Sequence, residues 1–200
     1  MKLIVCIAIF FLCSFNGYAQ EKAIIFKNVN VVDVVEGNIR KGQDVVIKEG
    51  IIQAIGKNVG TGVSGEVKDL TGMYMMPGLI DAHVHIANDP KESQEDRAKH
   101  LEYFLRHGVT SIRDAAGDAR VLQELKEGVL QGKYLGPDIY YAAFMAGPAY
   151  FEGNDREKSM VEGWSEPYAP WMQCIRPDTD LDKAMEGAKE WGCAGVKIYG

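Results

Sequence analysis

A change of pattern near residue 75 constrains the fold of this chain more than any other feature. From there strand-like segments alternate with segments of helical period, and strands are expected at about 75–86, 109–114, 138–144 and 194–199. Because a helix follows each of the first three strands, neighbouring strands should run parallel, with the helices packed outside the sheet. The sequence therefore predicts an α/β fold for residues 75–200.

Three helices are expected between these strands. Aspartates that can cap a first turn stand at their expected starts: Asp89 with Pro90 after it, Asp118 and Asp180. Apolar residues recur every three or four positions, which predicts one buried stripe on each helix. The residues expected in these stripes are Ala98, Leu101, Phe104 and Leu105, then Leu122, Leu125 and Val129, then Leu181, Ala184, Met185 and Ala188.

The segment before residue 75 has a different character. Between residues 20 and 74 short β-branched runs are separated by glycines, and no helical period is visible, so we expect a small β domain. Glu49-Gly50 is typical of a tight hairpin turn, because glycine tolerates a positive φ. Gly60–Gly65 matches G-x-G-x-x-G without the helix that must follow it, which argues against dinucleotide binding.

Residues 1–19 are interpreted as a signal peptide. Lys2 precedes an unbroken apolar run from Leu3 to Cys13, and small residues stand before a cleavage point after Ala19. The run is too short to span a bilayer comfortably, so no membrane span is expected. The mature protein should be periplasmic or secreted, in an oxidising compartment where Cys174 and Cys193 either pair or remain free thiols.

Composition narrows the class of partner. Apolar residues make up 46% of the chain and charged residues 25%, which excludes a disordered chain. The net charge of −6 argues against a nucleic-acid or anionic-membrane partner, because both need a basic footprint. Oligomeric state stays open.

Residues 146–177 interrupt the alternation. This long insertion follows a strand and therefore leaves from the carboxyl-terminal face of the sheet, where α/β enzymes build their sites. It contains Tyr150, Phe151, Trp164, Tyr168 and Trp171. These aromatic side chains either line a binding loop or pack against one another at the rim.

The candidate chemistry lies at Asp81-Ala82-His83-Val84-His85. Alternate residues of a strand share a face, so Asp81, His83 and His85 should point one way, while Ile80, Ala82, Val84 and Ile86 face the helices. Two such imidazoles can converge on one metal ion, with Asp81 accepting the second imidazole N–H. The alternative is a pair of solvated histidines at a strand end.

Two further residues are candidates by position. Lys197 lies inside a strand, where a lysine either reaches solvent with its head group or loses its proton and reacts with carbon dioxide to form an anionic carbamate. Asp114 ends the second strand, as a supporting carboxylate of the site or as the partner of Arg113.

Residues 69–85, Asp-Leu-Thr-Gly-Met-Tyr-Met-Met-Pro-Gly-Leu-Ile-Asp-Ala-His-Val-His, resemble the signature of the amidohydrolase superfamily. Val45–Gly56 resembles the sandwich strands before it, and Gly108–Asp114 resembles the second barrel strand of the branch that holds imidazolonepropionases and Xaa-Pro dipeptidases. The resemblance implies a small β-sandwich domain followed by a metal-dependent TIM barrel.

Carried over residue by residue, the resemblance implies that His83 and His85 bind divalent metal, zinc above all. It further implies that Lys197 is a carboxylated lysine bridging two metals. Asp81 and Asp114 are our catalytic candidates from their positions on the strands, apart from the resemblance. The activity implied is hydrolysis of a non-terminal or cyclic amide or dipeptide C–N bond by a metal-activated water. A mononuclear imidazolonepropionase- or deaminase-type enzyme remains an alternative.

The length leads to a further expectation. An eight-stranded barrel takes about 250 residues, whereas residues 75–200 hold four expected strands, so we expect the N-terminal half of a barrel from a truncated chain. The alternative from another class is an inactive fragment or a secreted ligand-binding module.

Overall fold

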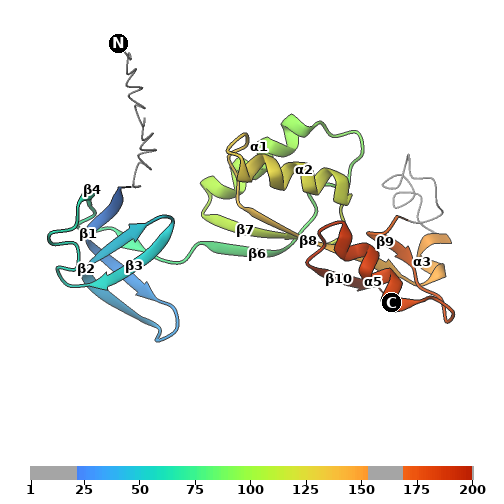
Figure 1. Ribbon diagram of the computed structural model, residues 1–200, viewed down its shortest axis with the longest axis horizontal. Helices are drawn as coiled ribbons and strands as arrows, with labels where there is room; N and C mark the ends of the chain where they lie inside the picture. The colour runs from blue at the N-terminus through green and yellow to red at the C-terminus, as the bar shows by residue number, and fades with distance from the viewer. Residues whose placement is uncertain (1–21, 153–168, 200) are drawn as a thin grey trace, which may run out of the picture. The chain divides into compact units, whose positions relative to one another are not determined.

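The computed structural model describes residues 22–152 and 169–199. The expected signal peptide, Trp164 and Tyr168 lie outside these residues. The chain divides into two compact units, residues 1–77 and residues 78–200. Each unit has its own sheet, and the two are described separately below (Figure 1).

The first unit is a five-stranded sheet. Its strands are β1 (Ala23–Asp33), β2 (Asn38–Lys48), β3 (Ile51–Gly56), β4 (Gly65–Asp69) and β5 (Tyr74–Met75). The spatial order is β3-β2-β1-β4, with the antiparallel pairs at β2, and β5 also pairs with β1. Ile25 and Val46 form its small core with Ala23.

The hairpin expected at Glu49-Gly50 is confirmed. It joins β2 to β3, and Glu49 and Gly50 have φ values of 54° and 72°. Two successive residues with positive φ follow the twist of paired strands, which is why this turn type suits a two-residue connection. The Gly60–Gly65 segment leads into β4, whereas a dinucleotide-binding G-x-G-x-x-G loop leads into a helix.

The second unit is a parallel α/β structure. Its strands are β6 (Leu79–Val84), β7 (Val109–Asp114), β8 (Asp138–Ala146), β9 (Met172–Cys174) and β10 (Gly195–Tyr199). They lie in the order β6-β7-β8-β10, the order of the sequence, with every pair parallel and β9 added beside β8. An order that never reverses, with right-handed crossovers, keeps the helices on one face of the sheet.

The first expected strand of this unit was too long. Residues 75–86 split into β5 of the first unit and β6 of the second. Pro77 stands between them and has no N–H to give to a sheet ladder, which explains the break.

The described residues of this unit form the helices α1 (Gln94–Arg106), α2 (Ala119–Leu130), α3 (Pro148–Glu152) and α5 (Leu181–Glu190). Asp118 and Asp180 cap α2 and α5, as expected. The expected start of α1 at Asp89–Pro90 is wrong, because Ser93 is the cap and its Oγ accepts from Asp96 N at 3.1 Å. Asp89 instead closes a turn, with its Oδ1 accepting from Lys91 N at 2.9 Å.

The core lies between the sheet and its helices (Figure 1). Leu101, Leu122 and Leu125 are fully buried, as expected. The expectation for α5 is half wrong: Ala184 and Ala188 are buried, but Leu181 is 58% exposed and Met185 48% exposed. These two side chains line an apolar cavity of about 610 Å³ with Met145, Ile175, Val196, Ile198 and other residues of β8 and β10.

The described part of the 146–177 insertion packs its aromatic side chains inward. Phe151 and Trp171 are buried, and the ring centroids of Tyr150 and Phe144 lie 4.8 Å apart. The alternative in which these aromatics pack at the rim therefore describes this part of the insertion.

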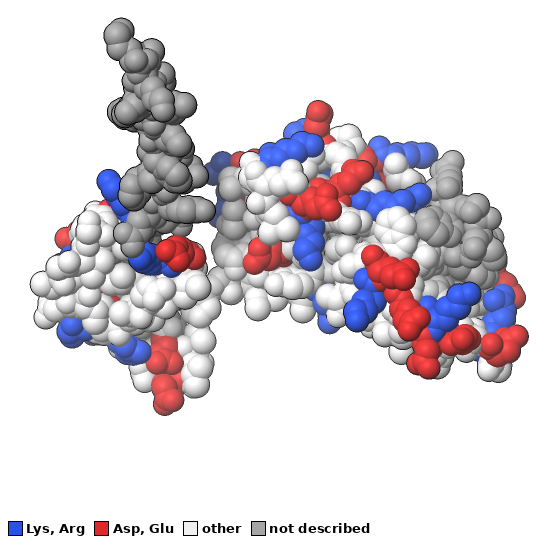
Figure 2. Space-filling model, in the orientation of Figure 1, with Lys and Arg blue, Asp and Glu red and all other residues white. Residues whose placement is uncertain are grey.

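The described surface carries both signs of charge. Acidic and basic side chains are interspersed over the second unit on the face that Figure 2 shows. Within residues 22–152 and 169–199, no helix is long and apolar enough to cross a membrane. Cys174 and Cys193 are both free thiols, so the paired alternative is not what the structure shows.

Candidate functional site

The two candidate histidines lie at the carboxyl end of β6. Their ring centroids are 5.1 Å apart and the ring planes meet at 64°. Both side chains are exposed, whereas Val84 and Ile86 between and beyond them are buried. The predicted alternation therefore holds from His83 to Ile86, and it turns two imidazoles toward the same side.

The alternation does not hold for the first half of the strand. Ile80 is 73% exposed and Ala82 is also exposed, although both were expected to face helices. Two features account for this correction. α1 packs on β7 rather than over this end of β6, and the pairing of β6 with β7 shifts register between Asp81 and Val84, as at a β-bulge.

Asp81 supports the backbone of the site. Its Oδ1 accepts a hydrogen bond from His83 N at 3.1 Å. The expected bond from Asp81 to an imidazole N–H is not found among the hydrogen bonds of the described residues. Asp81 therefore closes the register shift beside His83 rather than fixing a ring tautomer.

Asp114 is fully buried behind the histidines. Its Oδ2 accepts from Ile86 N at 2.7 Å, and its Oδ1 accepts from Ala116 N at 3.0 Å and from Gly117 N at 2.7 Å. Three backbone donors thus occupy the carboxylate, which makes it a support of the site rather than a group open to substrate. It is not the partner of Arg113, so that alternative is wrong.

Arg113 has a role that the sequence did not reveal. Its Nε donates to Ala82 O at 2.9 Å, which supplies a partner to the peptide group immediately before His83. Adjacent residues of a strand point to opposite faces, so Arg113 and Asp114 reach β6 from opposite sides. The register of two paired strands cannot be read from the sequence of one of them, so the sequence does not predict the bond from Arg113 to Ala82.

Lys197 is placed on β10, with β7 and β8 between it and β6. It is half-buried, it pairs in register with Phe144, and its Nζ lies 6.0 Å from the Tyr199 ring centroid. Within the described residues no contact joins Lys197 to either histidine. His100 and His107 have other partners. His100 Nδ1 faces Glu92 Oε1 at 3.2 Å, and His107 Nδ1 lies 2.7 Å from Tyr103 O.

The donor set fits part of a metal centre. Neutral imidazole nitrogens are good ligands for zinc, and two imidazoles from residues two positions apart on a strand can bind one ion. Across the described residues no group of three or more His, Cys, Asp or Glu side chains gathers. His83 and His85 therefore supply two ligands, and the described part of the chain does not complete the shell.

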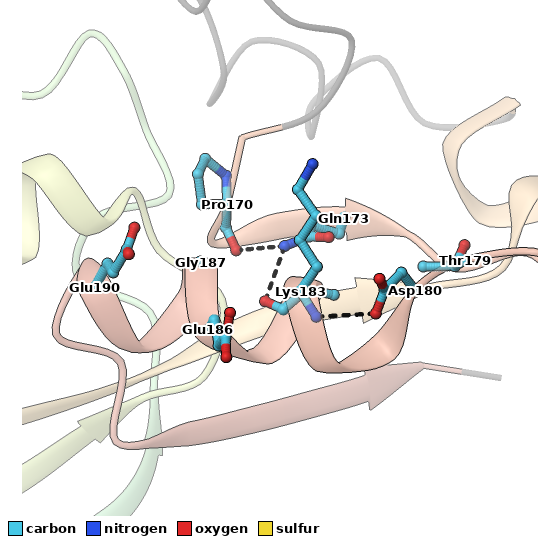
Figure 3. A pocket seen from close by; sticks show the side chains of 9 residues that line it. Pro170, Gln173, Thr179, Asp180, Lys183, Glu186, Gly187 and Glu190 are labelled. Carbon is cyan, nitrogen blue, oxygen red and sulfur yellow. Dashed lines mark hydrogen bonds between the residues drawn. The ribbon is translucent and has the colours of Figure 1, made fainter.

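A separate cavity of about 540 Å³ lies between α5 and β9 (Figure 3). Its polar groups hold the elements together: Gln173 Nε2 donates to Pro170 O at 2.8 Å and to Ala184 O at 3.2 Å. Asp180 Oδ1 accepts from Lys183 N as the cap of α5. None of the predicted site residues lines this cavity.

The sequence profile of the amidohydrolase family matches residues 74–193. This match covers more than half of the chain and includes both histidines and Asp114. The chain belongs to the amidohydrolase family.

Curated relatives of this amidohydrolase match over short stretches. A dihydroorotase from Trichlorobacter lovleyi is 35% identical over 89 residues, which is 44% of this chain and 21% of the relative. An adenine deaminase from Listeria welshimeri is 35% identical over 94 residues, 46% of this chain and 15% of the relative. The matched part of the chain thus spans about a fifth or less of these proteins.

Solved structures agree on the fold. A Xaa-Pro dipeptidase with bound methionine has a TM-score of 0.68 and 20% identity, over 88% of this chain and 47% of that one. A putative prolidase from Bifidobacterium longum has a TM-score of 0.62 and 24% identity, over 88% and 40%. At these identities the likeness speaks for the fold of the amidohydrolase and not for its substrate.

Proposed function

We propose that the protein carrying this chain is a metal-dependent hydrolase that cleaves a C–N bond in a non-terminal amide, a cyclic amide or a dipeptide. The observation that carries the proposal is the pair of exposed imidazoles at the carboxyl end of the first strand of a parallel α/β unit. That end of the strands is where such folds place their chemistry. Membership of the amidohydrolase family supports the reaction class.

His83 and His85 would hold a divalent metal such as zinc through neutral ring nitrogens. Bound there, the metal would polarise the scissile carbonyl and lower the pKa of an attacking water. The chain's own contribution is orientation: Asp81, Arg113 and Asp114 fix the backbone on either side of the two histidines. Asp81 and Asp114 would thereby contribute to catalysis by holding the backbone that carries the two histidines.

The same proposal extends to the architecture. The sequential parallel order of β6, β7, β8 and β10 is that of four consecutive strands of a TIM barrel, and likeness to solved amidohydrolase structures supports it. The first unit would correspond to the β-sandwich that accompanies the barrel. The substrate would be a small molecule, and residues 1–19 favour a periplasmic or secreted enzyme.

Two versions of the metal site differ at Lys197. In the binuclear version its side chain is carboxylated and bridges two ions; in the mononuclear version, as in deaminase-type members, it is not a ligand. The adenine deaminase relatives leave this second version open. A candidate of another class is a secreted ligand-binding module without catalysis.

The test is metal binding by the protein that carries this chain. His83→Ala and His85→Ala should each weaken Zn²⁺ binding by more than about 100-fold, because each removes a ligand. His100→Ala is the matched control: it is an exposed histidine of the same unit engaged with Glu92 and should leave Zn²⁺ binding unchanged. Unchanged binding in both site variants would overturn the proposal.

The same measurement separates the two versions of the site. In the binuclear version Lys197→Ala should reduce the metal content from two ions per chain to one. In the mononuclear version the metal content stays at one ion in both proteins. Metal binding without turnover of any amide, cyclic amide or dipeptide would favour the binding module.

A further inference from the structure

The carboxyl ends of β6 and β7 are joined by hydrogen bonds beyond their regular ladder. Ala115 N donates to Val84 O at 3.0 Å, and Asp118 N donates to Ala87 O at 3.2 Å. Between these two, Ile86 N donates to Asp114 Oδ2 at 2.7 Å. The segment that follows β6 is thus bound to the β7–α2 loop at three successive points.

Two of these bonds enclose His85. Val84 O belongs to the peptide group before His85, and Ile86 N belongs to the peptide group after it. Because both peptide planes are held, the φ and ψ of His85 are fixed between them, and so is the direction of its Cα–Cβ bond. The imidazole then has only its own side-chain torsions left to adjust.

Asp114 supplies the only side chain in this set of three bonds. Its carboxylate is fully buried, and its other oxygen is held by Ala116 N and Gly117 N. The space beside it is closed: a Cβ on Gly117 would lie 2.9 Å from Asp114 Oδ1 and 2.9 Å from Ala87 Cβ. The carboxylate therefore has a fixed place from which to hold Ile86.

We propose that Asp114 is a positioning residue for His85, which it orients through the Ile86 N–H rather than through contact with metal or substrate. The inference rests on the proposed function, because it takes His85 as a metal ligand. The chemistry explains why a carboxylate stands here. Three N–H donors approach its two oxygens, and a carboxylate, unlike an amide, offers an acceptor oxygen to each side.

Asp114→Asn tests the inference with little change of shape. An amide offers one oxygen, which should stay with Ala116 N and Gly117 N, and its NH₂ would then face Ile86 N–H, donor against donor. We expect Zn²⁺ affinity, measured by chelator competition, to fall about 10- to 100-fold, as when other groups that orient a ligand are removed. The visible absorption spectrum of the Co²⁺-loaded protein should also change, because ligand orientation sets it.

Asp118→Asn is the matched control. Asp118 is also a buried carboxylate of the β7–α2 loop, but its side chain accepts from Arg120 Nε and Arg120 N, and only its main-chain N–H reaches the segment after β6. Its replacement should lower stability while leaving Zn²⁺ affinity and the Co²⁺ spectrum as they are. Equal losses in the two variants would reduce Asp114 to a general structural role and overturn the inference.

A second variant removes the donor instead of the acceptor. Replacing residue 86 by the α-hydroxy analogue of isoleucine turns its N–H into an ester oxygen and leaves Asp114 with its other two donors. The same loss of affinity is expected, and wild-type affinity and spectrum in a folded ester variant would overturn the inference. His85→Ala distinguishes failure of the proposed metal site from failure of the positioning role. If His85→Ala keeps its Zn²⁺ affinity, the proposed metal site is wrong. If His85→Ala loses affinity while the Asp114 and residue-86 variants keep it, only the positioning role is wrong.

Discussion

At the scale of single residues, burial decides which side chains are reactive. Cys174 is buried and Cys193 is half-buried at the end of α5. Burial raises the pKa of Cys193 to about 11 and, on β8, that of Tyr141 to about 12. The thiolate is the reactive form of cysteine, so the Cys193 thiol does not have the environment of a nucleophile, and the Cys174 side chain is buried away from solvent.

Alkylation measures this directly. With a pKa of about 11, roughly one Cys193 thiol in a thousand is ionised at pH 8. Modification of the Cys193 peptide by iodoacetamide in the native protein should therefore be slow, and its rate should rise about tenfold per pH unit between pH 8 and 10. Unfolding should make Cys174 and Cys193 react quickly and alike. Fast labelling of native Cys193 at pH 8 would contradict the burial of its sulfur.

At the scale of elements, local caps compete along the chain. Asp89-Pro90 is a good helix start by composition, yet α1 begins four residues later at Gln94 with Ser93 as its cap. Arg97, buried in α1, donates to Asp89 O and faces Glu92 Oε2 at 3.7 Å, which holds the intervening residues in a turn. The contact from Arg97, eight residues along the chain, thus outweighs the favourable first position at Asp89 and Pro90.

Two alanine substitutions distinguish these caps. Ser93→Ala removes the acceptor for Asp96 N and should lower the free energy of unfolding by about 1 kcal/mol, the usual cost of a lost cap. Asp89→Ala removes only the bond from Lys91 N in an exposed turn and should cost less. Denaturant unfolding of both variants measures the difference, and the reverse order would place the start of α1 at Asp89.

At the scale of the whole molecule, the second unit has one covered and one open apolar side. Leu101, Leu122, Ile112 and Ile139 form a closed core beneath α1 and α2. By contrast Ile198 is 78% exposed, and with Leu181 and Met185 it borders the apolar cavity of α5. Contiguous exposed apolar surface of this kind favours association.

A polypeptide of residues 20–200 should therefore bind a hydrophobic dye and self-associate. The double variant Leu181→Gln with Met185→Gln should bind less of the dye 8-anilinonaphthalene-1-sulfonate, because it makes two exposed walls of the cavity polar. Leu130→Gln is the control, since Leu130 is exposed on α2 away from that cavity. Equal dye binding by all three proteins would show that this cavity is not the apolar surface responsible.

The sequence by itself determined the elements and the place of the histidine pair. Strand-helix alternation, the caps Asp118 and Asp180, and the Glu49-Gly50 turn depend on neighbours within a few residues, so they can be read locally. His83 and His85 share a side because period-two alternation is a property of the strand itself.

Only the tertiary structure decided how that pair is supported. Asp114 holds the residue after His85 from 28 positions away, and Arg113 holds the peptide before His83 from 31 positions away. The exposure of Leu181 and Met185 depends likewise on which elements pack over α5. These outcomes rest on contacts between residues distant in sequence, and a linear pattern that gives the type of an element does not say which distant group will complete its hydrogen bonds or cover its apolar face.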